Sequence, residues 1–99
     1  MKDPGYKLRV PDNLVELIRT MHPDLKKKVK TSFKIILSEP NAGKSLRKEL
    51  AGLYSFRVSR FRVIYRIVSS KQIEIVAIGP REQIYQETYR LLKKELKQR

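Results

Sequence analysis

Residues 53–66 alternate between apolar and polar side chains in two runs, and a short Ser59-Arg60 link separates the runs. Strict alternation is typical of β-strands with one buried face, and two such runs joined by a short link predict a β-hairpin. The apolar side chains fall on one face of that hairpin: Tyr54, Phe56, Val58, Phe61, Val63, Tyr65 and Ile67. The pattern therefore predicts two paired strands that present one apolar surface to the core.

The opposite face of the predicted hairpin carries arginines. A chain reversal at residues 59–60 pairs Arg57 with Arg62 and Ser55 with Ile64. Like charges at directly opposite positions normally destabilise a sheet, so we expect the two guanidinium groups to share a bound anion. The alternative interpretation is a solvated sheet face without a ligand.

The rest of the chain predicts helices and further strands. Alternation over residues 6–10 indicates a short first strand, and Asp12 can cap a helix that ends before Pro23. Pro23 can begin a second helix, with apolar residues repeating along one face. A strand over residues 73–77 and an amphipathic helix from Arg81 follow. This order predicts an α+β fold: a mostly antiparallel four-stranded sheet packed against an N-terminal helical hairpin and a C-terminal helix.

Length and charge limit the possible functions. The 99 residues suit one domain, which we expect to span residues 1–99. The formal net charge is +13, which favours polyanionic partners: nucleic acid first, then an acidic protein, then a membrane surface. The chain has no cysteine and one histidine, so we expect neither a disulfide nor a metal site. No apolar run is long enough for a signal peptide or a membrane span, and we expect a cytoplasmic protein.

Two local patterns receive structural interpretations. Residues 43–45 (Gly-Lys-Ser) resemble the end of a phosphate-binding loop, but that motif requires a glycine where Ser38 stands and a preceding strand rather than a helix. We therefore reject it. A three-residue turn after the hairpin sets Arg66 opposite Glu74, so we expect an ion pair between them rather than a contact with a ligand.

Three segments of the second half of the chain are similar to a known family. They are LAGLYSFRV over residues 50–58, FRVIYRI over residues 61–67 and IGPREQIY over residues 78–85. In this order and spacing, together with the predicted order of elements, they resemble the RelE/ParE superfamily of toxins from type II toxin–antitoxin systems. The resemblance covers nearly the whole chain and implies a RelE-like fold.

Members of the RelE branch are ribosome-dependent endonucleases that cut mRNA in the ribosomal A site, without a metal or another cofactor. The resemblance implies four catalytic residues. Arg62 and Arg81 match the phosphate-contacting arginines of the family, and Arg57 matches a basic position on the preceding strand. Tyr85 would stack on the mRNA base or orient it. The implied partners are the ribosome, mRNA and an acidic, RelB-like antitoxin, and no small molecule is expected.

The chain departs from the ribonuclease pattern at two positions. Ser55 stands where some ribonuclease members have a lysine, and Pro80 stands where others have a basic residue or a histidine. Two alternatives therefore stay open: a ParE-like inhibitor of DNA gyrase without nuclease activity, and a degenerate member that binds RNA or its antitoxin and cuts nothing. From the pattern alone, Arg81 could instead bond carbonyl groups of its turn, and Tyr85 could be a core residue.

Overall fold

The computed structural model describes residues 5–97, which form three α-helices, a short 3-10 turn and one five-stranded sheet. The strands are β1 (Lys7–Arg9), β2 (Lys44–Ser45), β3 (Leu53–Val58), β4 (Phe61–Ser69) and β5 (Gln72–Pro80). The helical segments are α1 (Asp12–Arg19), α2 (Pro23–Ser38), the 3-10 turn η1 (Lys48–Leu50) and α3 (Arg81–Lys97). The predicted α+β class is confirmed.

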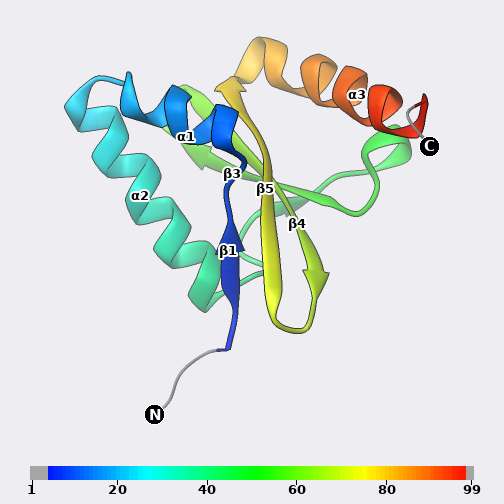
Figure 1. Ribbon diagram of the computed structural model, residues 1–99, viewed down its shortest axis with the longest axis horizontal. Helices are drawn as coiled ribbons and strands as arrows, with labels where there is room; N and C mark the ends of the chain where they lie inside the picture. Colours follow the sequence, from blue (N-terminus) through cyan, green and yellow to red (C-terminus); the bar gives the residue numbers. More distant parts are fainter. Residues whose placement is uncertain (1–4, 98–99) are drawn as a thin grey trace.

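The sheet has the strand order β1-β5-β4-β3-β2 (Figure 1). β1 lies parallel to β5, and the other neighbouring strands are antiparallel. The predicted number of four strands is wrong, because β2 forms an additional edge strand beside Tyr54 and Ser55. A strand of two exposed polar residues has no alternation to detect, so the sequence gives no signal for it.

The central hairpin has the predicted pairing of residues. Val58 lies opposite Phe61, and Arg57 lies opposite Arg62. Ser59 has a φ of 55° in the turn between the strands, a left-handed conformation that tight hairpins often need. Because opposite residues share a face of the sheet, the side chains of Arg57 and Arg62 lie on the same face.

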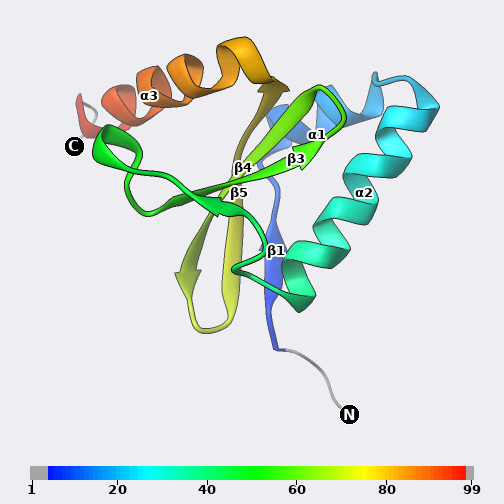
Figure 2. The same cartoon turned by 180° about the vertical axis from the view of Figure 1, so that it is seen from behind.

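Apolar residues cover both faces of the sheet. On one face, α1 and α2 pack on the strands through a cluster that includes Val29, Ile36, Val63 and Ile75, all fully buried. On the other face, α3 packs on a second cluster: Leu53, Ile64, Ala77 and Ile84. Figures 1 and 2 show the helical hairpin to one side of the strands and α3 to the other. The second face is also the one that carries Arg57 and Arg62, so α3 partly covers the arginine-bearing face.

The first backbone amides of α1 and α2 are capped in different ways. α1 begins at Asp12, and Pro11 takes the capping position without a side-chain hydrogen bond, so the predicted cap at Asp12 is wrong by one residue. The Asp12 carboxylate still suits the positive end of the helix dipole. At α2, Nδ1 of His22 accepts a hydrogen bond of 3.2 Å from the amide of Asp24.

Within residues 5–97, no helix has the length and apolar composition needed to cross a membrane.

Candidate active site

A pocket of about 320 Å³ opens beside α3 on the arginine-bearing face of the sheet. Its lining comes from β2, the segment after β2, β4 and α3: Lys44, Leu46, Arg47, Leu50, Arg62, Arg81 and Tyr85. Four of these side chains are cationic, and none is a carboxylate. Such a lining attracts anions, while the leucines and the tyrosine supply an apolar wall.

Arg62 reaches the pocket from β4. It is half-buried and lies opposite Arg57 on one side and Gly79 of β5 on the other. Gly79 has no side chain, and a Cβ atom at this position would lie 3.0 Å from Cδ1 of Ile84. The first turn of α3 therefore packs closely on β5 beside Arg62.

Arg81 is the first residue of α3. Its backbone amide donates a hydrogen bond of 3.0 Å to the carbonyl oxygen of Arg60 in the hairpin turn. Within the described residues, its guanidinium group makes no hydrogen bond to a carbonyl group of the turn. The alternative role that the sequence left open for Arg81, bonding the carbonyl groups of its turn, is therefore not observed. The positive end of the helix dipole lies at the same place and adds to the attraction for an anion.

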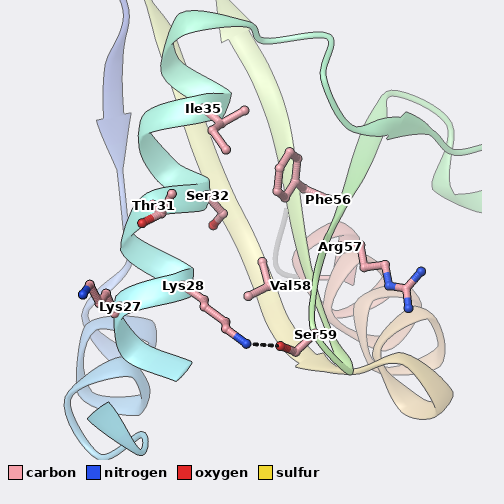
Figure 3. A pocket seen from close by; sticks show the side chains of 9 residues that line it. All are labelled: Lys27, Lys28, Thr31, Ser32, Ile35, Phe56, Arg57, Val58 and Ser59. Atoms are coloured by element: carbon pink, nitrogen blue, oxygen red, sulfur yellow. Dashed lines mark hydrogen bonds between the residues drawn. The ribbon is translucent and has the colours of Figure 1, made fainter. Parts of the chain in front are cut away.

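Arg57 lies beside this pocket rather than in its lining. It is an exposed residue among those that line a second pocket, of about 430 Å³, between α2 and β3. Figure 3 shows its side chain pointing away from α2. The structure thus brings Arg62, Arg81 and Tyr85 into one pocket and leaves Arg57 next to Arg62, outside the lining.

Tyr85 combines the two interpretations that the sequence leaves open. Its ring is half-buried and packs on the apolar cluster beneath α3, and the same side chain lines the pocket. Its hydroxyl group lies 3.1 Å from the hydroxyl group of Ser55. A tyrosine in this position can offer both a ring and a hydroxyl group to a ligand.

The predicted arginines are not neutralised by carboxylates. In the part of the chain that the structure describes, Arg57, Arg62 and Arg81 form no ion pair. Arg66, by contrast, contacts Glu74 at 2.7 Å. The predicted pairing of Arg66 with Glu74 is confirmed, and the cations of the pocket remain available to a ligand.

A buried tyrosine fixes the loop that leads to Lys44. The hydroxyl group of Tyr65 donates a hydrogen bond of 2.7 Å to the carbonyl oxygen of Pro40 and accepts one of 2.9 Å from the amide of Gly43. Burial raises the pKa of this hydroxyl group above its ordinary value of 10.0, although the Gly43 bond opposes the change. A Cβ atom on Gly43 would lie 2.8 Å from the same hydroxyl oxygen, so the close approach requires glycine.

Solved structures with the same fold include toxins and toxin–antitoxin complexes. A chain of the RelBE2 toxin–antitoxin complex from Mycobacterium tuberculosis is 29% identical, with a TM-score of 0.66 over 78% of this chain and 99% of that chain. For the archaeal RelE–RelB complex from Pyrococcus horikoshii OT3, the identity is 23% and the TM-score 0.64, over 78% and 96% of the two chains. For the isolated E. coli RelE toxin, the identity is 19% and the TM-score 0.65, over 88% and 98%. The predicted RelE-like fold is confirmed.

The sequence comparison decides the family. Residues 6–85 match the family model of the ParE toxin of the type II toxin–antitoxin system, parDE. This chain is a toxin of the RelE/ParE superfamily. A search of curated proteins gave no match to the toxin. The superfamily contains both ribonucleases and gyrase inhibitors, so membership in it is compatible with either activity.

The toxin's pocket contains two cations that the sequence analysis missed, Lys44 and Arg47. Residues 43–45 do not form a phosphate-binding loop, as the sequence analysis predicted, since Lys44 belongs to an edge strand. The available signal was compositional, because Lys44, Arg47 and Lys48 place three cations within five residues. The sequence pattern could not show that β2 folds back beside β3 and sets Lys44 opposite Ser55.

The pocket of the toxin has the chemistry of a phosphate site. Planar guanidinium groups can each bind two phosphate oxygens, and the ammonium group of Lys44 adds a point charge. Among residues 5–97, no group of three or more His, Cys, Asp or Glu side chains is placed to hold a metal ion. Such a lining can bind an anionic group such as a phosphate, and the ring of Tyr85 offers a surface for an adjoining aromatic group.

Proposed function

We propose that this toxin is a ribosome-dependent endoribonuclease that cuts mRNA in the ribosomal A site. The observation that supports it most directly is the pocket that gathers Arg62, Arg81, Lys44 and Arg47 around Tyr85 without a carboxylate in its lining. Binding to gyrase involves no stabilisation of charge that develops on a phosphate, so it does not by itself require unpaired cations around a pocket. A nuclease that has to stabilise charge on a phosphate does need them.

In the proposed reaction, the ribose 2′-oxygen attacks the adjacent phosphorus and the bond from phosphorus to the 5′-oxygen breaks. The products are a 2′,3′-cyclic phosphate and a free 5′-hydroxyl group. Arg62 and Arg81 hold the non-bridging oxygens and stabilise the extra negative charge of the transition state. Tyr85 stacks on the base or orients it, which sets the line of attack.

Proton transfer in this reaction uses groups outside the arginines. A guanidinium group stays protonated at working pH and cannot act as a general base. We infer that the 2′-hydroxyl proton passes to solvent or to a ribosomal group, and that the leaving 5′-oxygen takes a proton from the same sources. This division of labour explains why the reaction would depend on the ribosome. A toxin that acts on translating ribosomes would act in the cytoplasm, and we propose this location.

The proposed partner that neutralises the toxin is an acidic antitoxin. Similar chains occur in complexes named RelBE2 and RelE–RelB. The net charge of +13 favours a partner with many carboxylates, which would associate quickly and cover the cationic pocket. Arg57, exposed beside Arg62, is a candidate contact for both the antitoxin and mRNA.

Gyrase inhibition is the second candidate function. The family model that matches residues 6–85 is that of the ParE toxin, and this observation favours it. Ser55, where some ribonuclease members have a lysine, points in the same direction. A third possibility is a member that binds RNA or its antitoxin and cuts nothing.

Mapping of RNA and DNA ends after induced expression separates these functions. We expect new mRNA 5′ ends inside translated codons, and the same cuts when purified toxin is added to translating ribosomes but not to free mRNA. DNA breaks with inhibited gyrase supercoiling and intact mRNA would establish the second function instead. Harmless expression of folded toxin would leave the third.

A further inference from the structure

The hydroxyl groups of Ser55 and Tyr85 share a hydrogen bond of 3.1 Å. Ser55 belongs to β3 and Tyr85 to α3, so the bond joins the helix to the sheet. Within residues 5–97, it is the only side-chain hydrogen bond between α3 and a strand. The other packing of Tyr85 is with apolar residues, which do not fix the direction of a phenol group because the hydrophobic effect is non-directional.

Ser55 is well placed to act as a fixed point. Only 2% of its surface is exposed, and it lies between Lys44 of β2 and Ile64 of β4 in the sheet. A buried hydroxyl group without a hydrogen-bond partner is unfavourable. Ser55 therefore favours the position of Tyr85 in which the bond forms, although Ser55 itself is not among the residues that line the pocket.

We propose that Ser55 is a positioning residue: its hydroxyl group fixes the phenol oxygen of Tyr85, and thereby the ring, beside Arg62 and Arg81. The consequence for RNA cleavage rests on the proposed function. An aromatic ring that is already held in one position can align a base, so that the ribose oxygen faces the phosphorus, and the ring loses little conformational entropy when RNA binds. A ring held only by apolar contacts would rotate and lose part of that alignment.

A matched pair of variants tests this role. Ser55→Ala removes the hydroxyl group that bonds Tyr85, and Ser32→Ala removes an equally buried hydroxyl group that bonds a carbonyl group within α2. The first readout is the NMR resonance of the phenol carbon of Tyr85 in the isolated toxin. We expect Ser55→Ala to shift this resonance and Ser32→Ala to leave it unchanged.

The second readout is cleavage on translating ribosomes, at toxin concentrations that span saturation. We expect Ser55→Ala to lower the maximal rate by about tenfold with little change in the half-saturating concentration. Ser32→Ala should cleave like the unmodified toxin. Tyr85→Phe removes the same bond from the other side, so the double variant Ser55→Ala with Tyr85→Phe should be no slower than Tyr85→Phe alone.

The two readouts separate failure of this inference from failure of the proposed function. If the unmodified toxin does not cut mRNA, the nuclease proposal fails, and the Tyr85 resonance alone decides the positioning role. An unshifted resonance in Ser55→Ala overturns that role. It is also overturned if the toxin cuts and folded Ser55→Ala cuts at the unmodified rate, or if the effects of the two substitutions simply add.

Discussion

The backbone amide of Arg81 donates a hydrogen bond of 3.0 Å to the carbonyl oxygen of Arg60. This bond ties the first residue of α3 to the turn between β3 and β4, and Arg62 follows two residues after Arg60. On the other side of the turn, Nζ of Lys28 donates a hydrogen bond of 3.2 Å to the hydroxyl group of Ser59 (Figure 3). One short segment, held from α2 and from α3, therefore helps to position Arg62 and Arg81.

Replacing either Arg62 or Arg81 by alanine should abolish toxicity. Arg62→Ala and Arg81→Ala each remove a cation that we assign to the scissile phosphate, and the loss of one such donor costs about 100-fold in rate. We expect relief of growth arrest and at least that loss of cleavage on translating ribosomes. Circular dichroism checks that the variants are folded.

The control for this experiment is Arg19→Ala. Arg19 lies on α1 and pairs with Glu16 at 3.2 Å, so its loss changes the net charge equally without altering the pocket. It should stay toxic. Toxicity that persists in folded Arg62→Ala would contradict the assignment of this pocket as the active site.

Arg57 should have a weaker and salt-dependent effect. Because it is exposed and lies outside the pocket lining, we expect it to attract RNA rather than to hold the reacting phosphate. Arg57→Ala should raise the half-saturating concentration by about threefold at low salt and by less near 0.2 M salt, with the maximal rate unchanged. A large loss of maximal rate, equal to that of Arg62→Ala, would instead place Arg57 at the phosphate.

Tyr65 should contribute to stability through two buried hydrogen bonds. Tyr65→Phe leaves the Pro40 carbonyl oxygen and the Gly43 amide without this partner, at a cost of about 1–3 kcal/mol in the free energy of unfolding. Tyr54→Phe is the matched control, because Tyr54 stacks on Tyr65 with ring centroids 5.3 Å apart but its hydroxyl group makes no hydrogen bond within residues 5–97. Urea unfolding measures both. Equal losses in the two variants would show that the hydroxyl bonds contribute little.

The sequence predicts those parts of the fold that have a repeating pattern. Alternation fixes which residues of the hairpin face the core, so it also fixes the pairing of Arg57 with Arg62 and of Arg66 with Glu74. It does not reveal β2, because two exposed polar residues have no period. The edge strand forms through contacts between segments distant in the sequence, such as those of Tyr65 with the loop at residues 40–43.

The pocket is only partly predictable for the same reason. Arg62, Arg81 and Tyr85 stand in segments with recognisable patterns. Lys44, in the two-residue strand β2, and Arg47, in the irregular segment after it, join them only because the chain folds back beside β3. The bond between Ser55 and Tyr85 depends on how α3 lies on the sheet, and no spacing in the sequence reports that arrangement. Charged side chains in segments without a repeating pattern can therefore belong to a site that the sequence pattern predicts on strands and helices alone.

The stabilising contribution of Tyr65 should be lost as the pH rises above 10. Burial is the main cause that raises the pKa of the Tyr65 hydroxyl group in the folded state above its ordinary value of 10.0. As pH rises past 10.0, the unfolded chain loses this proton first, so the contribution of Tyr65 is complete below pH 10.0 and is lost as pH approaches the folded pKa. We expect the free energy of unfolding, measured in urea at about pH 8 and about pH 11, to fall more for the unmodified toxin than for Tyr65→Phe.

Lysines and the other tyrosines titrate in both proteins, so their effects largely cancel in the difference. Equal falls would mean that Tyr65 ionises as easily in the folded toxin as in the unfolded chain, against the buried and doubly bonded position that the structure gives it.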